Sequence, residues 1–418
     1  MIVRKTILPM TAAMLYCWLS WADSALAQNW TLSTAPGTNS WRAVACSADG
    51  SKLVAAASIG PIYTSADSGK SWSLTSAPTN HAWYAVASSA DGAKLVAAED
   101  DDFLYAYLFT SSDSGGTWVQ SAYAYWRAVA SSADGTRLVG VASKYTPYGS
   151  HNGIYTSADS GATWTLASAP DLFWGCVACS ADGTKIAAGA GAAAGYGTGP
   201  IYVSADSGTT WSLTGAPSNN WVAMAASADG SRLVAAAAWD ASGSAGSVYL
   251  SKDSGATWML TGAPSNFWSA VASSADGTRL VVAASYSAGS GPVYISTDSG
   301  ATWLAANLPQ TNWFSVASSA DGFKLYAAYS VGYPTAGGIY TYQSNPAARL
   351  DVIHSGTRLA LSWVVPSVNF VLQESSDLSR TNWTDVTTAP ILNFTNLQYQ
   401  VTVPATNASR FYRLFSRP

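Results

Sequence analysis

The sequence predicts an all-β protein whose main part is a seven-bladed β-propeller of four-stranded antiparallel blades. The prediction depends first on the tetrapeptide Ser-Ala-Asp-Gly, which ends at Gly50, Gly92, Gly135, Gly183, Gly230, Gly277 and Gly322. Successive copies lie 42 to 48 residues apart, the usual length of one propeller blade. Only 11% of the residues are charged, and the chain has 35 glycines and 19 tryptophans, which suits many short strands joined by tight turns.

Each repeat contains four candidate strands, which we label A to D. In the first repeat, strand A (41–46) follows the pattern Trp-x-[Ala/Cys/Ser]-[Val/Met]-Ala and ends before the tight turn at Asp49-Gly50. Strand B (52–58) is rich in Ala and Val, and strand C (62–65) carries bulky residues that prefer strands. A second turn, Ser-x-Asp-Ser-Gly-x-[Ser/Thr]-Trp, leads into strand D at Trp72.

The seventh repeat lacks the second turn, and its missing strand D appears at the other end of the chain. The segment Trp-Thr-Leu-Ser-Thr-Ala-Pro at 30–36 matches Trp-Ser-Leu-Thr-Ser-Ala-Pro at 72–78. We therefore expect the N-terminal strand to complete the last blade and to close the ring, which removes an open sheet edge.

The chain divides into four segments. Residues 1–27 have the pattern of a signal peptide, because Arg4 and Lys5 precede an apolar run and Ala25-Leu26-Ala27 offers small residues for cleavage. An uncleaved membrane anchor is the alternative, although the run is short for a span. We expect a secreted protein (extracellular, periplasmic or cell-surface) with no span after cleavage. The propeller is expected at 28–344, a linker at 345–349 and a separate module at 350–418.

The C-terminal segment (350–418) has a different pattern from the repeats. Short alternating apolar runs at 350–352, 359–363, 370–372, 401–403 and 411–415, with prolines between some of them, predict a small β-sandwich. The segment resembles the fibronectin-III-like modules at the ends of secreted bacterial proteins. That resemblance implies accessory adhesion or surface attachment rather than catalysis.

The second turn resembles the Asp-box, or BNR, motif of sialidases, some other glycoside hydrolases, sortilin-type receptors and photosystem assembly factors. Six copies place an aspartate at Asp67, Asp113, Asp159, Asp206, Asp253 and Asp298. In that family the box is structural, so the resemblance implies that these aspartates hold turns and are not catalytic acids. It also implies that the functional face lies opposite the boxes, where the D-to-A and B-to-C connections are.

One position directly after the strand A tryptophan varies while its neighbours repeat: Arg42, Tyr84, Arg127, Gly175, Val222, Ser269 and Phe314. We expect this position near the mouth of the central channel, where Arg42 and Arg127 could hold a carboxylate, sulfate or phosphate or stack on a sugar. A solvated structural arginine pair is the alternative. The candidate ligand-binding residues are Arg42, Tyr84, Arg127 and Phe314 at this position, and Glu99, Asp101, Tyr145, Tyr148, Tyr196, Trp239, Tyr286 and Tyr333 in the B-to-C loops.

The sequence favours binding over catalysis. A sialidase needs three arginines and a tyrosine paired with a glutamate, whereas only two arginines occupy the variable position and Glu99 is the one glutamate of the propeller. A glycoside hydrolase with an atypical site and an exported assembly or scaffold factor remain as alternatives. Variable loops rich in Tyr, Trp, Gly and Ser resemble a binding surface, although tolerated surface loops would look similar.

Several classes of partner are not indicated. The histidines His81, His151 and His354 lie far apart, the acidic run at 99–102 lacks the spacing of calcium loops, and no Gly-rich phosphate loop precedes a helix, so we expect neither metal nor cofactor. Cys176 and Cys179 form a CxxC pair that could suggest redox chemistry or a metal, but in a strand they should point to opposite faces. Cys46 and Cys179 occupy a position that is serine in other repeats and should be small buried residues. A net charge of −4 without a basic face argues against nucleic acid. We expect a monomer that binds a glycan or an envelope or extracellular protein.

Overall fold

The computed structural model describes residues 3–4, 29–99, 106–143, 145–146, 149–150, 152–191, 197–285, 291–331, 337–344, 350–355, 358–365, 370–376, 383–394, 397–404 and 410–416. These residues form strands and turns, and none of them is helical. Consequently no helix in the described part of the chain is long and apolar enough to cross a membrane. The all-β prediction is confirmed.

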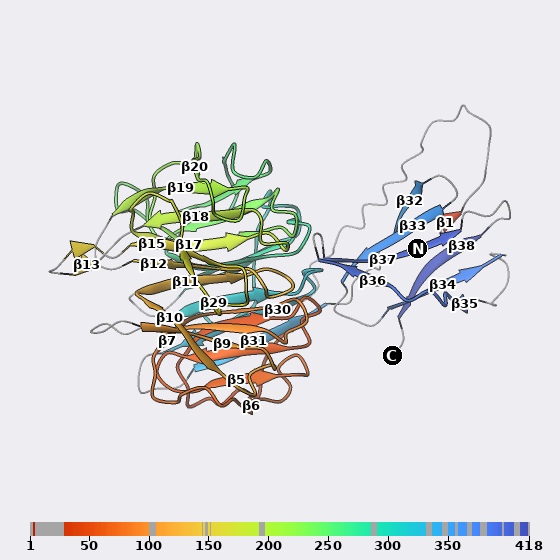
Figure 1. Ribbon diagram of the computed structural model, residues 1–418, viewed down its shortest axis with the longest axis horizontal. Helices are drawn as coiled ribbons and strands as arrows, with labels where there is room; N and C mark the ends of the chain where they lie inside the picture. The colour runs from red at the N-terminus through yellow and green to blue at the C-terminus, as the bar shows by residue number, and fades with distance from the viewer. Residues whose placement is uncertain are drawn as a thin grey trace.

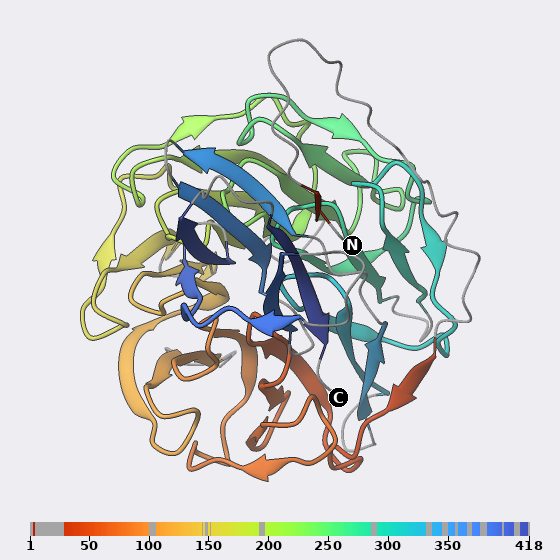
Figure 2. The same ribbon diagram turned by 90° about the vertical axis from the view of Figure 1, so that its right-hand side faces the viewer.

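Seven four-stranded antiparallel sheets are arranged in a ring, and each sheet is one blade (Figures 1 and 2). In blades 1 to 6 the strands follow chain order from the centre of the ring to its rim. The strands of blades 1 to 3 are β3 (Trp41–Cys46), β4 (Leu53–Ala57), β5 (Ile62–Ser65) and β6 (Ser73–Leu74); β7 (Trp83–Ser88), β8 (Leu95–Glu99), β9 (Ala106–Ser111) and β10 (Val119–Ala124); and β11 (Trp126–Ser131), β12 (Leu138–Ala142), β15 (Gly153–Ser157) and β16 (Thr165–Leu166).

The next three blades repeat this order. Their strands are β17 (Trp174–Cys179), β18 (Ile186–Gly191), β19 (Thr198–Ser204) and β20 (Ser212–Leu213); β21 (Trp221–Ala226), β22 (Leu233–Ala237), β23 (Val248–Ser251) and β24 (Met259–Leu260); and β25 (Trp268–Ser273), β26 (Leu280–Ala284), β27 (Val293–Ser296) and β28 (Leu304–Ala305). A small hairpin, β13 (Tyr145–Thr146) with β14 (Gly149–Ser150), extends from the B-to-C loop of blade 3.

Blade 7 is built from both ends of the repeat region, as the sequence predicts. Its strands are β29 (Trp313–Ser318), β30 (Lys324–Ser330), β31 (Gly337–Gln343) and β2 (Trp30–Leu32). The N-terminal strand β2 pairs antiparallel with β31, with Trp30 opposite Tyr342 and Leu32 opposite Tyr340. The Trp30 and Tyr342 rings are 5.5 Å apart, so an aromatic contact supports the backbone pairing.

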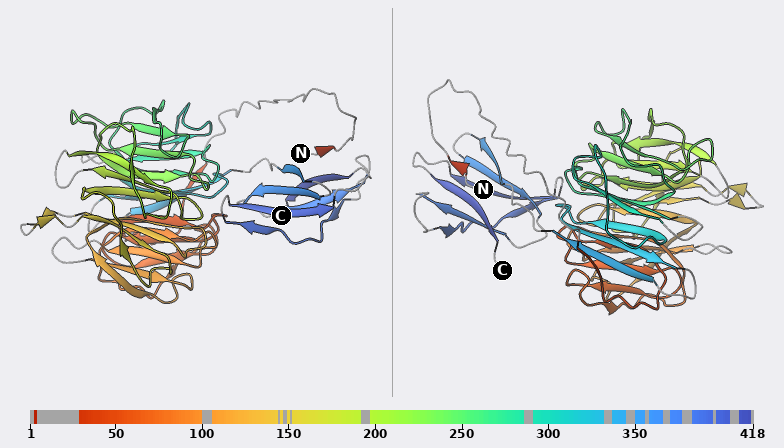
Figure 3. Two further views of the ribbon diagram at one scale, coloured as in Figure 1. Left: turned by 45° about the horizontal axis from the view of Figure 1, so that its top comes forward. Right: turned by 180° about the vertical axis from the view of Figure 1, so that it is seen from behind.

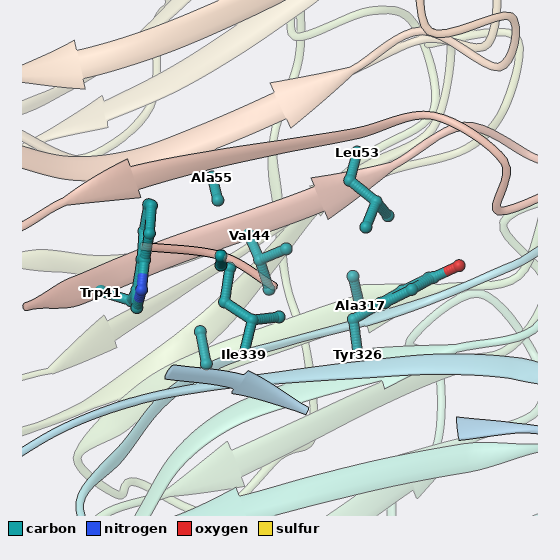
Figure 4. Packing of buried hydrophobic residues seen from close by; sticks show 9 residues of the cluster. Trp41, Val44, Leu53, Ala55, Ala317, Tyr326 and Ile339 are labelled. Atoms are coloured by element: carbon teal, nitrogen blue, oxygen red, sulfur yellow. The ribbon is translucent and has the colours of Figure 1, made fainter. Parts of the chain in front are cut away.

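The strand A tryptophans fill the seams between blades. All seven (Trp41, Trp83, Trp126, Trp174, Trp221, Trp268 and Trp313) are at most 1% exposed. Figure 4 shows Trp41 of blade 1 in a cluster that includes Tyr326 and Ile339 of blade 7, and Trp72 packs beside it at 6.2 Å. Burying an indole removes about 150 to 250 Å² from water, so one tryptophan per repeat explains much of the cohesion between blades.

The second turn of each repeat is held by an aspartate and a serine. In blade 1 the Asp67 carboxylate accepts bonds from the Ser65 hydroxyl at 2.8 Å and the Ser71 amide at 2.8 Å, while the Ser65 hydroxyl accepts from the Gly69 amide at 2.9 Å. Ser68 between them has φ of 62°, and the five later copies have the same left-handed serine. Polar side chains thus satisfy the turn amides, as expected for Asp and Ser at turns.

Basic side chains connect five of the seven blades to the next among the described residues, a regularity that the sequence analysis missed. The Lys or Arg two residues after the Ser-Ala-Asp-Gly glycine reaches the left-handed serine of the following blade's second turn. The bonds run from Lys94 to Ser160, Arg137 to Ser207, Lys185 to Ser254, Arg232 to Ser299 and Lys324 to Ser68, at 2.5 to 3.4 Å. Blade 7 has no second turn, and Arg279 instead lies over the Phe323 ring at 3.9 Å.

The C-terminal strands form two further four-stranded sheets with a core of their own. One sheet has the order β1 (Val3–Arg4), β38 (Phe411–Ser416), β34 (Phe370–Ser375) and β35 (Thr384–Asp385); the other has β32 (Asp351–Ser355), β33 (Arg358–Val364), β37 (Gln398–Pro404) and β36 (Ile391–Asn393). Leu361, Trp363 and Val401 are among the side chains buried between them. Apart from β1, the segment expected to be a signal peptide lies outside the described residues, and cleavage after Ala27 would remove only this two-residue edge strand from the described structure.

Candidate functional site

A β-bulge lies at the start of strand A in all seven blades. In blade 1, Trp41 pairs with Ala57 but Ala43 pairs with Ala56, so Arg42 is the extra residue of the bulge. The same register shift occurs directly after the tryptophan in the other six blades. Bulges redirect a side chain out of the regular strand alternation. The variable position found in the sequence is therefore the bulge position, a geometry that the sequence analysis did not predict.

The bulge positions surround a cavity of about 570 Å³. Strand A residues of all seven blades line it, which places the cavity at one end of the central channel. Six of the seven variable residues are among the lining: Arg42, Tyr84, Arg127, Val222, Ser269 and Phe314. The β13 hairpin of a B-to-C loop extends from the side of the ring that faces away from the C-terminal module (Figure 1). Three further B-to-C residues, Ala238, Trp239 and Ser285, line the cavity.

Four bulge residues from adjacent blades form a cationic and aromatic arc, in the order Phe314, Arg42, Tyr84 and Arg127. The Arg42 guanidinium carbon lies 4.3 Å from the Tyr84 ring centroid and 4.8 Å from that of Phe314. Arg127 lies 5.5 Å from the same Tyr84 ring, and its Nε donates to the Ser143 carbonyl at 3.2 Å. Among the described residues no acceptor takes a hydrogen bond from Arg42.

The remaining part of the cavity wall is small and mostly apolar. Val222, Met224 and Trp239 contribute to it. The Ser269 hydroxyl donates to the Trp313 carbonyl at 2.6 Å and is thus used within the protein. At Gly175 a Cβ atom would lie 2.3 Å from the Trp221 carbonyl oxygen, so close approach of the next blade requires glycine there. The cavity therefore has one cationic side and one apolar side.

Glu99, a candidate from the sequence, is buried and engaged within the protein. It is 8% exposed, its Oε1 lies 2.5 Å from His81 Nδ1, and its Oε2 accepts the Tyr107 amide at 2.9 Å. It does not belong to the cavity lining. Of the other loop candidates, Trp239 lines the cavity and Tyr145 is described only as backbone of β13. Asp101, Tyr148, Tyr196, Tyr286 and Tyr333 lie outside the described residues.

The six second-turn aspartates lie away from the cavity, and none of them contributes to its lining. Hydrogen bonds from the Thr163 hydroxyl and amide lower the pKa of Asp159 to about 2, and the equivalent bonds from Thr210 lower the pKa of Asp206 to about 2. A carboxylate held ionised by its own turn is a poor proton donor near neutral pH. These contacts agree with a structural role.

The three cysteines of the described residues are free thiols. Cys176 lines the cavity, whereas Cys46 and Cys179 lie at the other end of strand A. Burial raises the pKa of each thiol to about 12, which makes them poor nucleophiles. Within the described part of the chain, no group of three or more His, Cys, Asp or Glu side chains is placed to hold a metal ion.

Comparison with known proteins supports the fold but no family. No family model matches the chain, and no curated protein matches it in sequence. Among solved structures, YCF48 bound to D1 peptide has a TM-score of 0.53 at 14% identity, over 77% of this chain and 96% of that one. YCF48 from Cyanidioschyzon merolae has a TM-score of 0.54 at 13% identity, over 75% and 98%. The GH74 xyloglucanase from Xanthomonas campestris has 0.55 at 15% identity, over 81% of this chain and 59% of the enzyme. At these identities the similarity shows a β-propeller and nothing about activity.

Proposed function

We propose that this protein is an exported, non-catalytic binding propeller of the Asp-box type, with a fibronectin-III-like C-terminal module. Its ligand occupies the cavity at the bulge end of the channel and presents an anionic group to Arg42 and Arg127. The first candidate is a glycan or other envelope component that carries a carboxylate or sulfate. A guanidinium group binds such oxyanions through two parallel hydrogen bonds.

The observation that carries this proposal is the arc formed by Phe314, Arg42, Tyr84 and Arg127. The Tyr84 and Phe314 rings lie 4.3 Å and 4.8 Å from the Arg42 guanidinium carbon and so limit its motion. A cation that is already positioned by its neighbours loses less side-chain entropy when a ligand binds. Four adjacent blades supply these residues at their bulge positions. The side chain at this position varies between the repeats, whereas the strand pairing does not.

The charge of the cavity supports binding over hydrolysis. Its described lining contains two arginines and no Asp or Glu. Hydrolysis by the usual glycosidase mechanism needs two carboxyl groups about 5 to 10 Å apart at the scissile bond. The described lining of the cavity contains neither of these two carboxyl groups.

A peptide with an exposed carboxylate is a second candidate ligand, and the apolar wall is the observation that favours it. Val222, Met224 and Trp239 offer few hydrogen-bonding groups to sugar hydroxyls but suit aliphatic or aromatic side chains. One structural neighbour, YCF48, is described as bound to a D1 peptide, although its similarity to this chain concerns the fold. On this alternative the protein acts as an assembly or scaffold factor.

A binding screen with a turnover control tests the proposal. The purified mature protein is applied to an array of acidic and neutral glycans and to a library of peptides with free or amidated C-termini. Every ligand that is retained is incubated with the protein for a day and then analysed by mass spectrometry. We expect retention of anionic ligands without any product. Hydrolysis of a retained glycan, or retention of neutral ligands alone, would contradict the proposal.

A further inference from the structure

The C-terminal module contacts the propeller at the end of the channel opposite the bulges. The Ser-Ala-Asp-Gly alanines of all seven blades surround this end: Ala48, Ala90, Ala133, Ala181, Ala228, Ala275 and Ala320. Val365 of the C-terminal module is buried in the same apolar cluster, with Leu397, Leu392 and Tyr399 packed against it. Figures 2 and 3 show the module on this face of the ring, in front of its centre.

Leu397 borders the central channel. A cavity of about 170 Å³ is lined by residues from all seven blades, and within the described part of the C-terminal module Leu397 is the one residue that lines it. A space that is bordered by every blade must lie where the blades converge. The Leu397 side chain therefore borders the channel itself rather than the rim of the ring.

Val365 and Leu397 contact the alanine ring and do not belong to the core of the module. Val365 is 4% exposed, yet it belongs to the cluster with the alanine ring and not to the core around Leu361 and Trp363. Leu397 has φ of 52°, which is unusual for a bulky residue, and the Val365 amide donates to its carbonyl at 2.9 Å. A strained backbone that places a leucine at the channel end indicates a requirement for that side chain there.

We infer that the C-terminal module is a stopper: Val365 and Leu397 seal the channel at the alanine ring, so that ligands enter only from the bulge end. The sequence predicts adhesion or surface attachment for this module. The face of the module that contacts the ring instead seals the channel. It follows that an external partner can reach the propeller at its B-to-C loops or rim but not at the alanine ring. This inference does not depend on which ligand occupies the bulge cavity.

Native thiols can report on the seal, because Cys46 and Cys179 line the same cavity as Leu397, whereas Cys176 lines the cavity at the other end. The probe is iodoacetamide at pH 8, with alkylation of each cysteine followed over time by mass spectrometry of the full mature chain. The test variant carries Val365→Asp and Leu397→Asp. The matched control is Ile391→Asp in the same module, at a residue that is 74% exposed.

We expect Cys46 and Cys179 to react at least tenfold faster in the double variant than in the wild type or in the Ile391→Asp control, with Cys176 unchanged. If Cys176 accelerates as well, the double variant has lost its fold, and Leu397→Gly then decides. That substitution removes the side chain and relieves the positive φ, so it should still accelerate Cys46 and Cys179 selectively. Equal reactivity of these two thiols in the wild type and in Leu397→Gly would overturn the stopper.

Discussion

The backbone N–H of Ala320 in blade 7 donates a 2.7 Å hydrogen bond to the carbonyl of Ala48 in blade 1. It is the last member of a closed circle in which each Ser-Ala-Asp-Gly alanine donates to its equivalent in the next blade, at 2.6 to 2.8 Å. Residues 272 positions apart in sequence are thereby joined at the channel, while β2 joins the same two ends of the repeat region at the rim. The ring is therefore closed twice, by the alanine bonds at the channel and by β2 at the rim. Only the closure at the rim needs the N-terminal segment.

Deletion of residues 28–36 should lower the melting temperature far more than deletion of residues 345–418. The first deletion removes β2 and leaves β31 as an unpaired edge, whereas the second leaves all seven blades intact. Thermal unfolding of the two truncated proteins beside the parent is the measurement. If the N-terminal truncation melts like the parent, the circle of alanine bonds suffices for closure and β2 is dispensable.

Replacement of the left-handed serines by glycine should have different effects on the melting temperature at two equivalent positions. Glycine relieves a positive φ, worth roughly 1 kcal/mol, at both Ser207 and Ser114. Ser207, however, accepts a 2.5 Å bond from Arg137, whereas Ser114 receives no such bond from a described basic side chain. We expect Ser114→Gly to melt at or above the parent and Ser207→Gly to melt below Ser114→Gly. Equal melting temperatures would show that the bonds between blades add nothing.

The second-turn aspartates should make the propeller sensitive to acid. Hydrogen bonds from threonine hydroxyls and amides lower the pKa of Asp159 and Asp206 from 3.8 to about 2. A carboxyl group with a lowered folded-state pKa stabilises the protein above the unfolded-state pKa, and this contribution is lost as the pH falls through the folded-state value. The melting temperature should therefore fall between about pH 4 and pH 2.

Asp159→Asn is the matched variant for this pH dependence, because asparagine keeps the shape of the side chain and does not titrate. It should melt below the parent at pH 7, and the difference should shrink as the pH approaches 2. A difference that stays constant over this range would mean that ionisation of Asp159 does not stabilise the turn.

The repeat made most of the fold predictable from the sequence. Blade number, strand order and closure by Trp30–Leu32 follow from spacings that are visible in one chain. The bulge at Arg42 was not predictable, because a register shift of one residue between strands A and B leaves the spacing of the repeat unchanged. Its only trace in the sequence is that this position varies while Trp41 and Ala43 repeat.

The partners of single side chains were less predictable than the fold. The sequence predicts Glu99 as a ligand-binding residue in a loop. In the structure its carboxylate contacts His81 and accepts a hydrogen bond from the Tyr107 amide, so it lies inside blade 2. The sequence pattern does not single out Arg137, yet its guanidinium donates to Ser207 of the next blade. Both contacts depend on how neighbouring strands and blades are juxtaposed in space, which the order of residues along one strand does not reveal.

Ligand binding by three arginine variants tests the central claim most directly. The full-length mature protein is compared with Arg42→Ala and Arg127→Ala, which alter the cavity, and with Arg137→Ala, which removes a bond between blades at a residue that does not line the cavity. Affinity for the anionic ligand retained in the screen and melting temperature are measured for each. We expect Arg42→Ala and Arg127→Ala to weaken binding at least tenfold with melting temperatures near that of the parent, and Arg137→Ala to melt lower while it binds normally. If the two cavity variants bind like the parent, the arc at the bulges is not the ligand site.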